Sequence, residues 1–314
     1  MKIIMWLKKY AYPLFIISLI INLILIGEIL TENIRAGNIL KIQERYPYLS
    51  RRIFAENQND LLIYFVPLRE AMRKYVKEQP EEIGVYFEYL PSGTSIGVNE
   101  KMEVRFASLI KMPGVMAVYK QIEKGAMRKN DVLAVKEENI NRGFGNLWRK
   151  GSGTKITVEE AIVLSLIESD NTAYRVLASA LPLGALEDVF NNLDITIEQI
   201  QGFPIITPKN YTSILRSLYL SSYLQREDAN EILSLLTQTP FNDKLVAGVD
   251  PGVKVAHKIG TFESDGIFSD CGIIYIPNRP YSLCIMVRGN NETATKHMTL
   301  LSKMVFGYVV QVSN

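Results

Sequence analysis

Strand-like sequence stands at both ends of the long C-terminal part of this chain, and helical sequence fills the region between. Residues 84–98 hold two apolar runs on either side of a Pro-Ser-Gly turn, which predicts a β-hairpin. Further apolar runs follow only late in the chain, at 252–258, 272–276 and 281–287. A last helical stretch over 292–310 comes after them. Because strand-like sequence lies on both sides of a helical middle region, we expect one antiparallel sheet built from both ends. Helices flank this sheet and an all-helical lobe is inserted, which makes an α/β (α+β) fold.

Two helix starts in the middle region carry their own capping residues. Thr157-Val158-Glu159-Glu160 has the capping-box form and predicts a helix that continues to Ile167. Thr207-Pro208 joins a good capping residue to a proline that fits the first helical turn, so it predicts a second helix. The pattern predicts further helices over 67–77 and 108–124.

The composition is that of a globular protein. Of the 314 residues, 47% are apolar and 22% are charged, which argues against a disordered chain. The formal net charge is +2 and no long basic run occurs in the body, so we expect no nucleic acid as a partner. With two histidines and two cysteines in the sequence, we expect no metal site and no cofactor.

An almost uninterrupted apolar run extends from Tyr10 to Gly27, directly after Lys8 and Lys9. A run of about 18 residues is short for a membrane span but long for a signal-peptide core. No good cleavage site follows it, so we expect an uncleaved anchor, with a cleaved signal as the alternative. Lysines before a span keep that end inside. We therefore expect a single-pass protein of the cell membrane whose main domain is extracytoplasmic.

These observations divide the chain into four expected parts. Residues 1–9 form a cytoplasmic stub and residues 10–30 one transmembrane helix. Residues 31–58 are mixed and charged in sequence, which is typical of a spacer. The main domain occupies residues 59–314.

Cys271 and Cys284 stand on two consecutive predicted strands, joined by the turn at 277–280. An oxidising compartment permits a disulfide between them. Counted from the turn, however, their positions look diagonal rather than directly opposed, so two buried free thiols are at least as good an interpretation. The sequence leaves both alternatives open.

Ser108 and Lys111 are three residues apart, which places both side chains on one face of a helix. A serine hydroxyl becomes a good nucleophile only when a base removes its proton. Lysine is such a base if its pKa falls from about 10.4 toward neutrality, which burial and a second nearby cation such as Lys258 favour. Taken alone, Ser108 is equally typical of a helix cap.

Two further motifs supply what acyl transfer through a serine needs. Ser169-Asp170-Asn171 offers a hydroxyl for a proton relay, and Lys258-Ile259-Gly260-Thr261 offers a cation with backbone donors. Each is unspecific alone, because Ser, Asp and Asn are common between helices and a Lys-x-Gly sequence ends many strands.

The three motifs, in this order and spacing, resemble those of the active-site-serine penicillin-recognising enzymes, specifically the class A β-lactamase family. The resemblance extends over roughly residues 60–314. It includes the longer segments 106–113, 166–173, 239–245 and 252–258. The fold that it implies is β-lactamase-like.

The resemblance implies a role for each motif residue. Ser108 attacks the carbonyl carbon of an amide, and Lys111 takes or relays its proton. Ser169 passes a proton to the departing nitrogen with the help of Lys258, whose charge also attracts an anionic substrate. A further group binds substrate: Asn171 holds the substrate side-chain amide, Gly260 and Thr261 lie beside it, and the backbone N–H groups of Ser108 and Thr261 form the oxyanion hole.

Two departures from the family pattern concern affinity and turnover. The family usually has a hydroxyl residue at the position of Ile259, and methyl groups do not hydrogen-bond a substrate carboxylate. The family's deacylating glutamate lies in a Glu-x-x-Leu-Asn pattern that is missing from the short interval 194–206. Glu198 is the only glutamate there, a candidate deacylation base or a solvated surface residue. Without such a base, acylation proceeds and hydrolysis of the ester stays slow.

We therefore expect a membrane-anchored, extracytoplasmic serine hydrolase of class A β-lactamase type, which opens β-lactams or related D-alanyl amides through an acyl-enzyme on Ser108. Its expected partners are a β-lactam or peptidoglycan-peptide substrate and the membrane. The alternative is a penicillin-binding D,D-peptidase or a slowly deacylating penicillin-binding or sensing module. A relic of the fold without chemistry is a third possibility.

Overall fold

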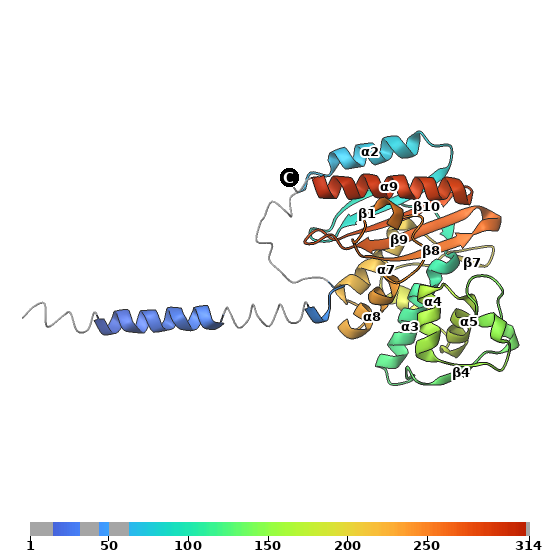
Figure 1. Cartoon of the computed structure of the whole chain (residues 1–314), viewed down its shortest axis with the longest axis horizontal. Coiled ribbons are helices and arrows are strands. Elements are labelled where there is room, and N and C mark those ends of the chain that lie inside the picture. Colours follow the sequence, from blue (N-terminus) through green and yellow to red (C-terminus); the bar gives the residue numbers. More distant parts are fainter. Residues whose placement is uncertain (1–14, 32–43, 50–62, 312–314) are drawn as a thin grey trace, which may run out of the picture. The chain divides into compact units, whose positions relative to one another are not determined.

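The computed structural model describes residues 15–31, 44–49 and 63–311. The chain divides into two units, Met1–Pro47 and Tyr48–Asn314 (Figure 1). In the first unit residues 15–31 form a helix. Among the described residues, no helix combines the length and apolar character needed to cross a membrane. The expected stub (1–9), the start of the expected anchor (10–30) and most of the expected spacer (31–58) lie outside the described residues.

A five-stranded antiparallel sheet forms the centre of the second unit, in the order β2-β1-β10-β9-β8. The early hairpin supplies β1 (Glu82–Tyr89) and β2 (Thr94–Val98). The late strands are β8 (Val255–Phe262), β9 (Ile267–Ile274) and β10 (Tyr281–Arg288). Because β1 pairs directly with β10, the prediction of a sheet built from both chain ends is confirmed.

The late strands are longer than the sequence indicated. The predicted strand was 252–258, whereas β8 begins at Val255 and continues past Lys258 to Phe262. The cause is pairing with β9, which holds Gly260 opposite Ser269 and Thr261 opposite Phe268. Lys258, Gly260 and Thr261 therefore lie within a regular strand.

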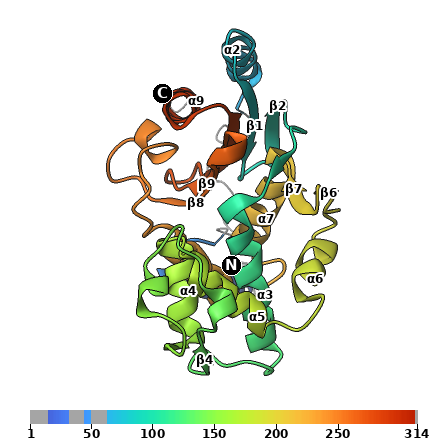
Figure 2. The same ribbon diagram turned by 90° about the vertical axis from the view of Figure 1, so that its right-hand side faces the viewer.

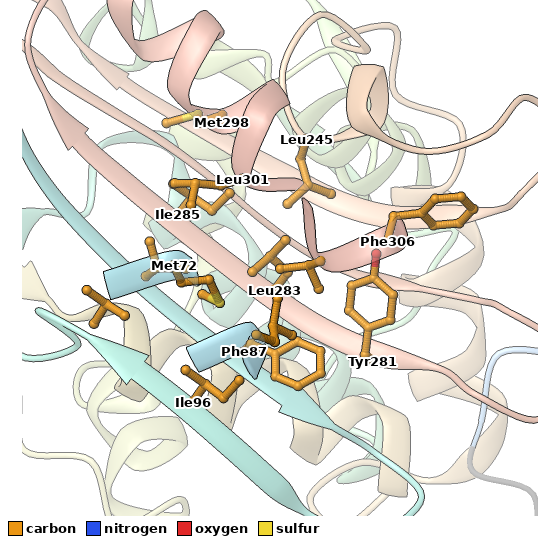
Figure 3. Close-up of a cluster of buried hydrophobic side chains, with 14 of the residues drawn as sticks. Met72, Phe87, Ile96, Leu245, Tyr281, Leu283, Ile285, Met298, Leu301 and Phe306 are labelled. Carbon is orange, nitrogen blue, oxygen red and sulfur yellow. The ribbon is translucent and has the colours of Figure 1, made fainter. Parts of the chain in front are cut away.

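Helices cover both faces of the sheet (Figure 1). On one face lie α2 (Val66–Lys77) and α9 (Asn291–Gln311), close to the predicted ranges 67–77 and 292–310. Figure 3 shows their side chains, among them Met72, Met298 and Leu301, against Phe87 and Leu283 of the sheet. On the other face α7 (Pro208–Leu220) contacts β1, β9 and β10. Burial of strand residues on both faces follows from this arrangement.

The helical lobe lies beside the sheet (Figure 2). Its helices are α3 (Lys111–Glu123), α4 (Val158–Ile167), α5 (Asn171–Ala180), α6 (Ala185–Asn192) and α8 (Arg226–Leu236). Short strands brace the loops: β3 (Val104–Arg105), β4 (Val132–Ala134), β5 (Lys155–Thr157), β6 (Gln199–Ile200) and β7 (Phe203–Ile206). Both predicted helix starts are confirmed. The Thr157 hydroxyl accepts a hydrogen bond from Glu160 N at 3.1 Å, and the Thr207 hydroxyl accepts one from Asn210 N at 3.2 Å.

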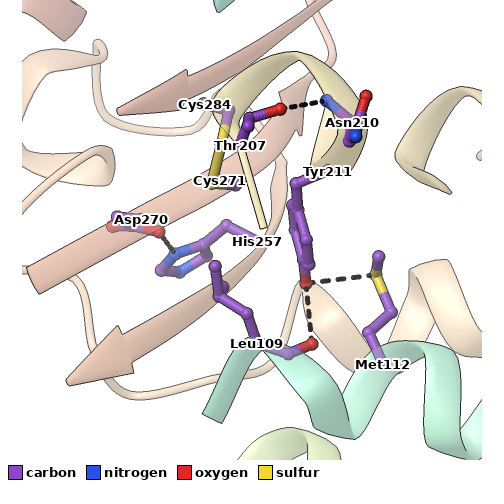
Figure 4. Close-up of a disulfide and its surroundings, with 9 residues drawn as sticks. All are labelled: Leu109, Met112, Thr207, Asn210, Tyr211, His257, Asp270, Cys271 and Cys284. Carbon is purple, nitrogen blue, oxygen red and sulfur yellow. Dashed lines mark hydrogen bonds and ion pairs between the residues drawn. A yellow bond between two sulfur atoms is a disulfide. The ribbon is translucent and has the colours of Figure 1, made fainter. Parts of the chain in front are cut away.

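The two cysteines are joined by a disulfide. Cys271 of β9 and Cys284 of β10 are direct partners in the strand register, with Cα atoms 3.9 Å apart (Figure 4). The expected diagonal offset was wrong, because β9 ends at Ile274, before the predicted end at 276, and pairs Ile274 with Tyr281 across a longer turn. A covalent link therefore joins β9 to β10.

Replacing Cys271 and Cys284 together with alanine is expected to lower the free energy of unfolding. The disulfide closes a loop with a sequence separation of 13. A loop of that size restricts the unfolded chain by an amount worth about 2–4 kcal/mol. Urea unfolding of both proteins, each refolded with and without reductant, measures the difference. Reductant should destabilise only the parent protein; equal stability of all four samples would contradict the prediction.

Candidate active site

Ser108 lies on a short 3₁₀ turn, η2 (Ala107–Ile110), that leads directly into α3. The expected helix 108–124 is therefore divided, since the α-helix itself begins at Lys111. Ala107 adopts a left-handed backbone conformation with φ of 45°, which turns the chain just before the serine. The carbonyl of the neighbouring Leu109 accepts a hydrogen bond from the Tyr211 hydroxyl at 3.4 Å, which ties the turn to α7 (Figure 4).

Close packing of this turn against β8 requires the glycine of the third motif. A Cβ at Gly260 would lie 2.8 Å from Leu109 Cγ and 3.1 Å from Phe106 O. Only a residue without a side chain allows that approach. β8 is also the edge strand of the sheet, so alternate backbone groups on its outer side have no ladder partner. The backbone of Thr261 is thereby held near Ser108, as an oxyanion hole made from these two residues needs.

Lys111 connects the nucleophile to the second motif. Its Nζ is hydrogen-bonded to Ser108 Oγ at 2.8 Å. It also lies 3.1 Å from Ser169 Oγ and 2.6 Å from the Ser169 carbonyl oxygen. A further hydrogen bond of 2.5 Å reaches Asn171 Oδ1. The predicted pair of Ser108 and Lys111 is thus in contact, and its base is fixed on several sides.

Lys258 completes the arrangement from the sheet. Its Nζ donates to Ser169 Oγ at 2.8 Å and to the Ile259 carbonyl at 3.4 Å. Ser108, Lys111, Ser169 and Lys258 therefore form one continuous chain of hydrogen bonds between η2, the α4–α5 link and β8. Such a chain can carry a proton from the attacking hydroxyl to a leaving nitrogen.

Burial sets the charge state of the two lysines. Lys111 is 2% exposed, and desolvation lowers its pKa to about 7, against the opposing charge of Asp170. Burial also lowers the pKa of Lys258, with a second contribution from the charge of Lys111 and an opposing one from Asp270. Burial, and not the charge of the suggested second cation Lys258, is therefore the cause of the lowered pKa of Lys111. Because its pKa is about 7, the buried amine of Lys111 is available to accept the proton of Ser108.

The Ser169-Asp170-Asn171 segment links α4 to α5 and also belongs to the site, so both interpretations of it hold. Asp170 caps α5 by accepting a hydrogen bond from Ala173 N at 2.8 Å. Its second oxygen accepts one from Leu147 N at 2.8 Å. Ser169 has a φ of 55°, a left-handed conformation rare outside glycine. The segment is thereby fixed with its hydroxyl toward the two lysines.

Asn141 is a site residue that the sequence reasoning missed. Its Oδ1 accepts a hydrogen bond from Asn171 Nδ2 at 2.9 Å. Since Asn171 Oδ1 is bound by Lys111, this bond fixes the orientation of the amide. Asn141 lies in an irregular segment without a known spacing to the other motifs, so no sequence signal pointed to it.

Glu198 is exposed and stands just before β6. Its carbonyl accepts a hydrogen bond from Ile205 N at 3.0 Å within the β6–β7 hairpin. Within residues 63–311, the Glu198 carboxylate has no hydrogen bond to the motif residues. In the same range, no other Asp or Glu carboxylate is hydrogen-bonded to the side chains of Ser108, Lys111, Ser169 or Lys258. Ile259 is buried in β8 at 5% exposure.

Arg105 is a second residue that the sequence reasoning missed. Its guanidinium carbon lies 4.0 Å from the ring centre of Phe203 and 5.0 Å from that of Phe262. It also forms an ion pair of 3.2 Å with Asp265 and a hydrogen bond of 3.1 Å to Gln201 Oε1. Arg105 thus joins the strand before the Ser108 turn to the end of β8, directly after Thr261.

Groups of His, Cys, Asp and Glu that could hold a metal ion do not occur in the described part of the chain. What the hydrogen-bonded serines and lysines allow is transfer of an acyl group to Ser108 without histidine. The fold and this site define a serine hydrolase.

The chain belongs to the beta-lactamase enzyme family, whose sequence pattern matches residues 67–309. Solved structures with the same fold include PBP-A, at 22% identity and a TM-score of 0.72, with 78% of this chain and 97% of that chain covered. A beta-lactamase from Sphaerobacter thermophilus has 19% identity and a TM-score of 0.71, with 79% and 99% covered. The TLA-1 extended spectrum beta-lactamase has 20% identity and a TM-score of 0.70, with 78% and 98% covered. Among curated proteins, no relative matches.

Proposed function

We propose that the protein opens the amide of β-lactams or related D-alanyl peptides through an ester on Ser108. The contact of 2.8 Å between Ser108 Oγ and a buried Lys111 amine, whose pKa is about 7, carries this proposal. A mutant of PBP-A, a protein of the same fold, is known as an acyl-enzyme complex with penicillin G.

The steps follow the hydrogen bonds of the site. Ser108 Oγ attacks the carbonyl carbon while its proton passes to Lys111. Backbone N–H groups of Ser108 and Thr261 stabilise the oxyanion, and such a donor is typically worth about 2.7–4 kcal/mol. The proton then reaches the leaving nitrogen through Ser169, which bonds both lysines. The carbon–nitrogen bond breaks and the acyl group stays on Ser108.

Intact-protein mass spectrometry of the full chain after incubation with benzylpenicillin tests this function. A mass increase equal to one whole penicillin is expected, because ring opening releases no fragment. The increase should map to the peptide that contains Ser108. Failure to form the adduct at any pH near neutrality would refute the proposal.

A slowly deacylating penicillin-binding D,D-peptidase is the second candidate. The observation that favours it is the exposed Glu198, together with the lack of a carboxylate bound to the described motif residues. Hydrolysis of the ester needs a base within reach of the attacking water. With a chromogenic cephalosporin, one stoichiometric burst followed by little turnover supports the peptidase; sustained turnover supports the β-lactamase.

We further propose that residues 10–30 anchor the protein to the cell membrane, with the catalytic domain outside the cytoplasm. In support, twelve large apolar side chains between Phe15 and Leu30 are 44–67% exposed on the helix over 15–31. The disulfide also fits an oxidising compartment. Cell fractionation tests the anchor: detergent but not high salt should release the full chain from the membrane pellet.

Loss of the Arg105 side chain is expected to slow acylation, because the turn with Ser108 and the end of β8 lose a common anchor. A small misplacement of catalytic groups costs up to about 100-fold. Acylation rate constants with benzylpenicillin compare Arg105→Ala with Arg105→Lys, which keeps the charge but stacks less well on the rings. The lysine variant should recover part of the rate without a change in the pH profile. An alanine variant as fast as the parent would contradict this role.

A further inference from the structure

The segment 141–155, which ends at the first residue of β5, is strongly basic. It contains four cationic side chains and no Asp or Glu. All four are exposed, and within the described residues none of them forms an ion pair; they are Arg142, Arg149, Lys150 and Lys155. Elsewhere in the molecule arginines such as Arg216 and Arg288 are paired with carboxylates. The charge of this segment is therefore available to another molecule.

Two of these cations are ordered by one aromatic ring. The guanidinium carbons of Arg142 and Arg149 lie 5.9 and 5.1 Å from the ring centre of Trp148. Stacking on an indole limits the motion of an arginine without neutralising its charge. Both groups are thereby held in place, and their N–H donors stay free for a planar anion such as a carboxylate.

The basic segment is fixed to the catalytic motif. The Phe144 carbonyl accepts a hydrogen bond from Asn171 N at 3.0 Å, and Leu147 N donates to Asp170 Oδ2 at 2.8 Å. Between them, Gly145 has a φ of 87°, and a Cβ there would lie 2.1 Å from the Asp170 carboxylate. The segment and the motif are therefore in direct backbone contact, and neither can shift without the other.

This contact places the arginines on one side of the site. Arg142 directly follows Asn141, whose side chain holds the Asn171 amide. Adjacent Cα atoms are about 3.8 Å apart, so the backbone of Arg142 lies beside the residue that holds the Asn171 amide. In the proposed function Asn171 binds the amide on the acyl side of the substrate. The segment that carries the two arginines is therefore attached to the site at Asn171, on the acyl side of the substrate.

We propose that Arg142 and Arg149, stacked on Trp148, bind a carboxylate on the acyl side of the substrate. The preferred substrate is therefore an acidic acyl compound, with its extra carboxylate close to the amide that Asn171 holds. This inference rests on the proposed acylation of Ser108 and adds the charge of the substrate to it.

Three penicillins that differ at a single carbon next to the side-chain amide test the inference. Benzylpenicillin is neutral there, carbenicillin carries a carboxylate and ampicillin an ammonium group. The second-order acylation constant of the full chain is measured for each. Carbenicillin should react faster than ampicillin in the parent protein. That preference should decrease at about 0.5 M salt, because the interacting charges are exposed.

The Arg142→Gln/Arg149→Gln variant should lower the ratio of carbenicillin to ampicillin constants about five- to tenfold, as expected for two exposed charge contacts. Its constant for benzylpenicillin should change less than the other two and shows that the site is folded. A second variant, Arg142→Glu, should shift the ratio further in favour of ampicillin.

The control is Lys74→Gln/Lys77→Gln on α2, which removes the same charge from exposed positions on a helix of the opposite layer. It should leave the ratio unchanged. A ratio that stays the same in the arginine variants, or falls equally in the control, would overturn the inference alone. If none of the three penicillins forms an adduct with the parent protein, the proposed function fails, and this inference fails with it.

Discussion

The Ser108→Ala protein is expected to form no covalent adduct with benzylpenicillin and to lose hydrolysis almost completely. Ser108 Oγ is hydrogen-bonded to the buried amine of Lys111 at 2.8 Å, whereas Ser169 Oγ lies between Lys111 and Lys258 as the proton relay. Loss of a catalytic serine in enzymes of this general type reduces turnover by about 10⁶-fold. The remaining groups still bind substrate, so non-covalent binding of penicillin should persist. Intact mass and calorimetry measure the two properties separately.

Ser92→Ala is the matched control for this experiment. Ser92 is exposed on the turn between β1 and β2, and its hydroxyl lies 2.8 Å from that of the exposed Thr94. The control should react as the parent does. An adduct of full stoichiometry on the Ser108→Ala protein would show that another residue is the nucleophile.

The second large effect concerns Lys111 and pH. Its neutral form is the base, and burial lowers its pKa to about 7. Below that pH the amine is protonated and cannot accept the proton of Ser108; above it the neutral fraction rises toward one. The acylation rate constant of the parent protein should therefore increase with pH and level off above about 8.

Lys111→Arg should remove this pH-dependent limb, because a guanidinium stays protonated over the whole range. General-base catalysis typically contributes about 10²–10⁴-fold, so we expect a loss of that size. The same substitution at the exposed Lys209 serves as the control. Stopped-flow acylation over a range of pH gives both profiles. A parent profile that is flat from about pH 6 to 9 would mean that Lys111 is not the base.

Local sequence signals predicted those parts of the molecule that local chemistry decides. The capping box at Thr157, the N-cap at Thr207 and the pairing of Ser108 with Lys111 all depend on residues three positions apart. The order of strands around a helical middle also predicted the sheet from both ends, because apolar strands need a common buried layer.

Contacts between distant segments were not predictable in this way. The positions of Asn141 and Arg105 depend on packing across 30 residues or more of sequence, for which the chain carries no periodic signal. The register of Cys271 with Cys284 depends on where β9 ends, and strand ends are the least certain part of any such prediction. Of the two causes expected for a lowered pKa of Lys111, burial is confirmed, whereas the charge of Lys258 does not contribute.

The pairing of β1 with β10 has a consequence for how the chain acquires its structure. Residues 82–89 have their main-chain partners at 281–288, far along the sequence and beyond the whole helical lobe. Closing so long a loop is entropically costly and makes folding slow. One edge of the first hairpin therefore stays unpaired until residues 281–288 have been synthesised. A ribosome that stops before the last strand therefore leaves a product that cannot assemble its central layer.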